Sequence, residues 1–232
     1  HGPVHALAQL PRNATGTSFP PLVATGERVL LRAEEVAGAS ELQAQGLKGL
    51  VLDLRGNPGG LLDSAWQVSS RFLADGSPVV KTKGRNRAED QELVAPGEGP
   101  YANIPMVVLV DESSASASEI VSGALRDDGR ATVIGERTFG KFSVQNLIPL
   151  SSSNAKLKIT TARYYTPSGR LIQRPWDGTF DEYLTYTIKD QSAPREHAPS
   201  ELKYTDSGRK VYSGGGIEPD HFVAGPVEGF NP

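Results

Sequence analysis

Two short segments of small residues carry the groups most able to do chemistry. Residues 113–118 (Ser-Ser-Ala-Ser-Ala-Ser) stand directly before a helical pattern, where the positive field of a helix N-terminus favours a negatively charged nucleophile. Residues 55–60 (Arg-Gly-Asn-Pro-Gly-Gly) offer no nucleophile, but their glycines let backbone N–H groups turn toward one point, as in an oxyanion hole. Acyl transfer is the chemistry these segments would support, although an N-cap and a plain turn are their commoner roles.

A nucleophilic serine needs a base, and the histidines are poorly placed to be one. All four lie in segments that look peripheral, at positions 1, 5, 197 and 221. A Ser-His-Asp triad is therefore not expected. A lysine can act as the base when burial lowers its pKa enough to leave it neutral. Lys141 stands between Phe139 and Phe142, which makes it the best candidate, although such a lysine often only packs its stem on the rings.

The surrounding elements predict an α/β fold of repeated strand-turn-helix units. Residues 49–54 and 104–110 have the nearly continuous apolar character of strands buried on both faces. Helical patterns follow them at 61–73 and 119–127. Further expected elements are strands at 27–33, 78–80 and 131–135, a helix at 40–45, and a hairpin with arms at 144–150 and 157–165. Loop or irregular structure is expected at 1–26, 81–100 and 173–232.

Composition excludes several classes of protein. The 232 residues carry 24 Lys+Arg and 27 Asp+Glu, which gives no basic excess for binding nucleic acid or an anionic membrane. The longest apolar run, residues 104–110, is far shorter than the roughly twenty residues of a membrane span. Cysteine is absent, which excludes disulfides, thiolate metal sites and cysteine catalysis. No cluster has metal-ligand or phosphate-loop spacing, so no cofactor is expected.

Several longer motifs, in order, resemble the C-terminal processing peptidases, also called tail-specific proteases. The motifs occupy residues 49–62, 114–120, 135–141, 144–145, 164–170 and 216–220. The resemblance covers residues 48–173 densely and the C-terminal part in patches. It implies a crotonase- or ClpP-like α/β core with a β-hairpin extension and an irregular C-terminal segment.

The resemblance also implies roles for particular residues. Ser116, the middle serine of its motif, matches the nucleophile, and Lys141, 25 residues later, matches the base that takes its proton. Gln145 matches the residue that orients this base. The oxyanion donors would be the N–H of Ala117 and that of a glycine, Gly60 in preference to Gly59. Asp127 matches an acidic position that supports activity.

Two features depart from the family pattern. Phe142 replaces the usual glycine after the lysine, where its ring would either desolvate Lys141 further or crowd the substrate groove. Residues 1–47 are too short for the PDZ domain that normally precedes the core. We therefore expect an N-terminal segment at 1–47, a protease core at 48–173 and an extension at 174–232 packed on the core. The chain begins at His1 without a signal segment, which indicates a processed or excised form.

The sequence thus predicts a serine endopeptidase that cuts proteins or peptides at or near exposed C-termini through a Ser-Lys dyad. The resemblance places it outside the cytoplasm, in a bacterial periplasm or cell envelope, and leaves a homo-oligomer open. One alternative is a latent or inactive core of the same fold that binds peptides or lipophilic ligands. A ClpP-like triad is a further alternative, but it would require a histidine that the motifs do not supply.

Overall fold

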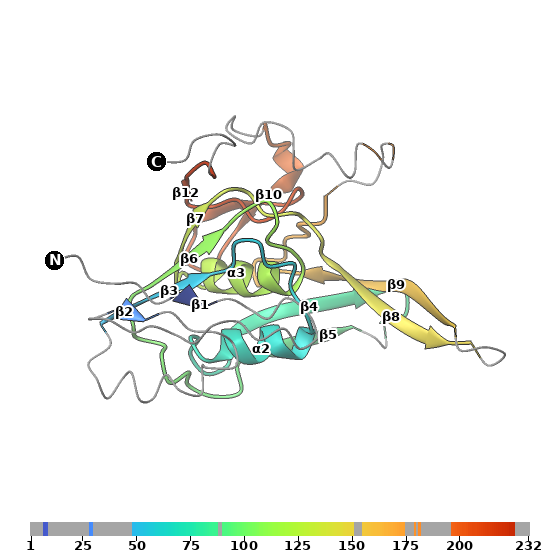
Figure 1. Ribbon diagram of the computed structural model, residues 1–232, viewed down its shortest axis with the longest axis horizontal. Coiled ribbons are helices and arrows are strands. Elements are labelled where there is room, and N and C mark those ends of the chain that lie inside the picture. Colours follow the sequence, from blue (N-terminus) through green and yellow to red (C-terminus); the bar gives the residue numbers. More distant parts are fainter. Residues whose placement is uncertain are drawn as a thin grey trace.

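A parallel sheet forms one layer of the molecule, and it carries the two chemical segments at the ends of its strands (Figure 1). The computed structural model describes residues 7–8, 28–29, 48–87, 90–150, 155–174, 179, 181 and 196–225. The strand order is β1-β3-β6-β7-β12, and β2 also pairs with β3. The strands are β1 (Leu7–Ala8), β2 (Arg28–Val29), β3 (Gly49–Asp53), β6 (Met106–Val110), β7 (Thr132–Gly135) and β12 (His221–Phe222). All of the pairings are parallel.

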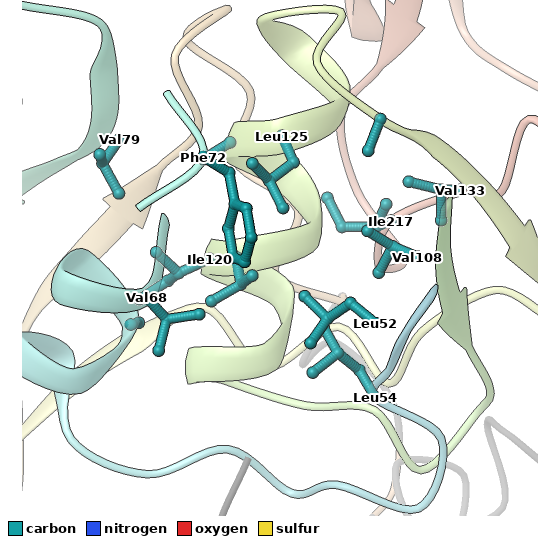
Figure 2. Close-up of a cluster of buried hydrophobic side chains, with 14 of the residues drawn as sticks. Leu52, Leu54, Val68, Phe72, Val79, Val108, Ile120, Leu125, Val133 and Ile217 are labelled. Atoms are coloured by element: carbon teal, nitrogen blue, oxygen red, sulfur yellow. The ribbon is translucent and has the colours of Figure 1, made fainter. Parts of the chain in front are cut away.

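Two helices follow the central strands and bury their apolar faces against one another. α2 (Leu62–Ser70) comes after β3, and α3 (Ala117–Asp127) comes after β6. Every residue of α3 is buried, because the helix contacts α2, β7 of the parallel sheet and β4 of a second sheet. Figure 2 shows the resulting core, in which side chains from α2 and α3 meet those of the parallel strands.

The second sheet is antiparallel and has the order β5-β4-β9-β8. Its strands are β4 (Pro78–Gly84), β5 (Gln91–Val94), β8 (Ser143–Pro149) and β9 (Lys156–Tyr165). β8 and β9 project from the body of the molecule as a long ribbon, yellow to orange in Figure 1. A bulge interrupts their register between Val144 and Gln145.

The described part of the C-terminal segment returns to the core. After the 3-10 turn η3 (Pro199–Glu201), β10 (Leu202–Tyr204) and β11 (Lys210–Tyr212) form a small antiparallel pair. Ile217 is fully buried in the main core, and β12 pairs with β7. This segment therefore completes the parallel sheet.

The mixed α/β fold confirms the predicted class, and the central strands and both helices lie where the sequence places them. The expected strand at 27–33 is present as β2, within this window, and the expected helix at 40–45 lies outside the described residues. Three expectations of irregular structure are wrong, because β1, β5 and the elements from η3 to β12 lie in them. These strands have two to four residues each, which is too short to show a periodicity.

Candidate active site

Ser116 occupies a strained corner between β6 and α3. Its backbone angles are φ 56° and ψ −112°, and it is the only residue other than glycine with positive φ in the described part of the chain. Such a conformation costs on the order of 1–3 kcal/mol and persists only where surrounding contacts enforce it. As the N-cap of α3, Ser116 also lies in the positive field of the helix N-terminus.

The glycine-rich loop after β3 lies directly on this corner. Gly59 has φ 88°, and a Cβ there would lie 2.4 Å from the Ala115 carbonyl oxygen and 2.5 Å from the Ala117 nitrogen. No side chain larger than hydrogen fits between these backbones. The Asn57 carbonyl fixes the approach, because it accepts a hydrogen bond from Ala115 N–H at 3.0 Å. The fold thus brings together the two segments that the sequence singled out.

The two glycines of this loop differ in what their N–H groups can do. Gly59 N–H donates to Asn57 Oδ1 at 2.9 Å and is therefore already engaged. Gly60 N–H has no acceptor among the described residues, and a Cβ there would meet nothing within 4 Å. Gly60 N–H is therefore the better candidate to pair with Ala117 N–H as an oxyanion donor.

The buried carboxylate of Glu119 links the Ser116 corner to residues 138–141, the part of the loop between β7 and β8 that we call the lysine loop. Its Oε2 accepts hydrogen bonds from the backbone N–H groups of Ser116 and Lys141, both at 2.9 Å. Its Oε1 accepts from the Thr138 hydroxyl and from Gly140 N–H, both at 2.6 Å. The sequence reasoning missed this residue. The signal was present, since Ser116 and Glu119 have the spacing of a capping box.

The protonation state of Glu119 matters for this arrangement. Complete burial raises the pKa of Glu119 to about 7, against the opposing effect of its four hydrogen-bond donors. Only the ionised carboxylate can accept all four bonds without turning a proton toward a donor. The docking of the lysine loop therefore depends on a group that titrates near neutral pH.

Lys141 is half-buried, with its backbone fixed by Glu119. Burial lowers the pKa of Lys141, the nearby charge of Lys158 lowers it further, and the charge of Glu119 opposes both. The predicted direction is therefore confirmed. The ring of Phe142 is fully buried in the core and packs edge-on against Tyr164, with ring centroids 5.6 Å apart.

The Ser116 and Lys141 backbones are held by one carboxylate, but their side chains do not bond to each other. Within the part of the chain that the structure describes, no hydrogen bond joins the Ser116 hydroxyl to the Lys141 amino group. Gln145 lies exposed on β8, just beyond the bulge. Catalytic hydrogen bonds are often long or absent before substrate binds.

Asp127 lies at the far end of α3, away from the serine. Eleven residues of helix span about 16 Å at 1.5 Å per residue. The Asp127 carboxylate accepts from the backbone N–H and hydroxyl of Ser168, at 3.1 and 2.5 Å, and from the Arg170 guanidinium. These contacts give it a structural role, which is to anchor the turn after β9.

A strained serine at the carboxyl end of a parallel strand, followed at once by a helix, is typical of α/β enzymes that hydrolyse acyl bonds. The chain belongs to peptidase family S41, whose family model matches residues 32–179. Proteins of this family act on protein substrates.

Named relatives support the same assignment. The chain is 51% identical over 134 residues to a carboxy-terminal-processing protease of Bartonella bacilliformis, covering 58% of this chain and 30% of that protein. It is 44% identical over 142 residues to a carboxyl-terminal-processing protease of Synechocystis, covering 61% and 32%. Among solved structures, the photosystem II D1 C-terminal processing protease matches with a TM-score of 0.52 and 39% identity, over 59% of this chain and 35% of that one. The chain thus spans about a third of the length of these relatives.

Proposed function

We propose that this chain is the catalytic core of a serine endopeptidase that cleaves proteins near their C-termini. The observation that carries the proposal is the shared carboxylate of Glu119, which fixes the backbones of Ser116 and Lys141 relative to each other. A binding module does not require a strained serine and a half-buried lysine at one carboxylate. The preference for C-terminal tails rests on the names of the relatives.

In the proposed reaction, the neutral Lys141 amine takes the proton of the Ser116 hydroxyl as its oxygen bonds to the substrate carbonyl carbon. The N–H groups of Ala117 and Gly60 stabilise the resulting oxyanion. The C–N bond then breaks, and the proton on Lys141 passes to the leaving amine. Water hydrolyses the acyl-enzyme by the same steps, with Lys141 again as base. Gln145 orients the amine toward Ser116.

The test is labelling of the whole chain by a fluorophosphonate, together with cleavage of casein. We expect labelling of wild type and none of Ser116→Ala, whose fold is retained because an N-cap costs only about 1 kcal/mol. Ser113→Ala, at an exposed serine of the same segment, is the matched control. Equal labelling of wild type and Ser116→Ala would place the nucleophile elsewhere.

A second candidate is a latent form of the same core, which the unengaged Ser116 and Lys141 side chains favour. It predicts that the chain neither labels nor cleaves by itself although it is folded. The labelling experiment distinguishes the two forms, because only a serine activated by its base reacts readily with a fluorophosphonate.

The names of two relatives bear on where the protein acts. The relatives from Arabidopsis and Tetradesmus carry the word chloroplastic in their names, and we propose that this chain acts outside the cytoplasm. No helix in the described residues is long and apolar enough to cross a membrane.

A further inference from the structure

The segment of residues 172–174, which follows β9 and the turn after it, contacts the lysine loop. Arg174 N–H donates a hydrogen bond to the Gly140 carbonyl at 2.9 Å, and the Arg174 guanidinium stacks on Phe139, 3.5 Å from the ring centroid. A Cβ on Gly140 would lie 3.2 Å from the Arg174 Cβ, so the two backbones approach closely. Glu119 on α3 and this segment therefore hold the same loop from two different parts of the fold.

Gln173 bonds to the residue directly after the proposed base. Its Oε1 accepts a hydrogen bond from Phe142 N–H at 2.8 Å, and its Nε2 donates to the Arg174 carbonyl at 3.4 Å. Because Phe142 N–H can only donate, the amide oxygen of Gln173 faces it. Among the described residues, this is the only hydrogen bond formed by the peptide group that joins Lys141 to Phe142.

The two peptide groups that flank the Lys141 Cα are thus held at separate points. In the preceding group both the N–H and the carbonyl are bonded, to Glu119 and to Arg174. In the following group only the N–H is bonded, to Gln173. Peptide groups are planar, so rotation about the N–Cα bond of Lys141 moves its Cβ together with the following group. Holding both groups therefore fixes the direction in which the lysine side chain leaves the backbone.

We propose that Gln173 is a positioning residue for the base, because by holding the peptide group after Lys141 it aims the amine at the Ser116 hydroxyl. The proposal rests on the proposed function of these two residues. Gln173 acts through the backbone, whereas Gln145 would act on the amine itself. Catalytic groups must be held within about 0.5 Å and about 10–20° of their productive geometry. A small turn of the Lys141 backbone is amplified at the end of its long side chain, and a displacement of about 1 Å lowers a rate about a hundredfold.

The experiment measures the rate of fluorophosphonate labelling per folded molecule in wild type, Gln173→Leu and Gln173→Glu, with the folded fraction taken from circular dichroism. Gln173→Leu removes the acceptor, and its labelling should be about tenfold to a hundredfold slower. Gln173→Glu keeps an oxygen at Phe142 N–H and should recover most of the wild-type rate at alkaline pH. Gln67→Leu, at an exposed glutamine of α2, is the matched control and should label like wild type. A wild-type rate in Gln173→Leu, or equal losses in both Gln173 variants, overturns the proposal.

The pH profile of labelling separates positioning from a change in the pKa of the base. In Gln173→Leu the rate should level off below that of wild type, because a misdirected amine stays misdirected when it is fully neutral. Recovery of the full rate at high pH would show that Gln173 acts on the pKa of Lys141, and it would overturn the proposal. In Gln173→Glu the added negative charge should raise the pKa of Lys141 and move the rise of labelling to higher pH. The charged groups that already act on this pKa, Lys158 and Glu119, are the same in every variant.

Nuclear magnetic resonance of the same proteins tests Gln173 without any catalysis. The order parameter of the Lys141 Cα–Hα bond reports how firmly that backbone is held on the picosecond-to-nanosecond timescale. We expect about 0.85 in wild type, a fall toward about 0.6 in Gln173→Leu and recovery in Gln173→Glu. Equal order parameters in wild type and Gln173→Leu overturn the proposal. Failure of wild type to label counts against the proposed activity alone, because the order parameter is measured whether or not the chain reacts.

Discussion

Asp127 and Arg170 form an ion pair whose side chains are 0% and 1% exposed. Removing one member of a buried pair leaves an uncompensated charge, so Asp127→Ala should lower the free energy of unfolding by about 3–5 kcal/mol. Urea denaturation measures this loss. Replacing both residues, as in Asp127→Ala/Arg170→Met, should cost less than the sum of the single changes. Lost cleavage with an unchanged denaturation midpoint would instead assign Asp127 to the chemistry.

Replacing Glu119 should separate its positioning role from that of an ordinary core residue. In Glu119→Gln the amide NH₂ faces N–H or O–H groups that now donate hydrogen bonds to the carboxylate. An unsatisfied buried group costs about 1–3 kcal/mol. Labelling of Ser116 should therefore fall by at least about tenfold. Glu92→Gln, which removes a surface carboxylate paired with Lys81, is the control. Unchanged labelling in Glu119→Gln would show that the Ser116 and Lys141 backbones hold their positions without it.

Glu119→Gln should also change how the free energy of unfolding depends on pH. The pKa of Glu119 is raised from 4.5 to about 7 in the folded state, so the folded protein binds the proton more tightly than the unfolded chain does. This stabilisation is complete below pH about 4.5 and is lost as pH rises through about 7. Between these two pH values the free energy of unfolding of wild type should fall by about 3 kcal/mol, at 1.36 kcal/mol per pKa unit. That of Glu119→Gln should not show this fall, because the amide does not titrate. Urea titrations at several pH values measure the difference, and parallel profiles would contradict it.

Lys141→Arg should be as damaging to proteolysis as Lys141→Ala. Arginine stays protonated at any accessible pH and cannot accept the Ser116 proton. In wild type, burial and Lys158 lower the pKa of Lys141, so cleavage of casein should rise through that pKa and level off at neutral to alkaline pH. Full activity of the Arg variant, or a bell centred below pH 6, would exclude a lysine base.

The adjacent glycines provide a matched pair of substitutions. Gly59→Ala places a methyl group 2.4 Å from a backbone oxygen at positive φ and should cost about 3 kcal/mol or more in unfolding free energy. Gly60→Ala enters open space and keeps its N–H, so both stability and labelling should stay near wild type. Thermal denaturation distinguishes them, and equal melting temperatures would refute the close approach of the loop to Ser116.

The parts of this fold that could be predicted from the sequence are those with enough residues to carry a pattern. β3 and β6 are apolar runs with one face buried and the other partly buried, and the motif around Ser116 marked the strand-to-helix corner. β5 could not be found, because three of its four residues are exposed and its pairing with β4 is decided by tertiary contacts.

Side-chain directions were the least predictable feature of the site. Phe142 precedes β8, and its ring lies in the core beside Tyr164. Glu119 has only the local spacing of a capping box with Ser116, and its bonds to Gly140 and Lys141 depend on a loop 21 and 22 residues away. Local sequence cannot encode contacts between segments that only the folded chain brings together.

The complete burial of α3 gives the two halves of the site different exchange behaviour. Amide protons of a fully enclosed helix exchange with solvent only when the whole domain opens, whereas those of a projecting two-stranded ribbon exchange through local fraying. Ser116 stands at the start of the helix that we expect to exchange slowly, and Gln145 lies on the ribbon that we expect to exchange quickly. Deuterium uptake should therefore rank residues 118–127 slowest and 145–150 among the fastest. The site would therefore combine a serine held on a rigid helix with a glutamine held on a ribbon that opens locally.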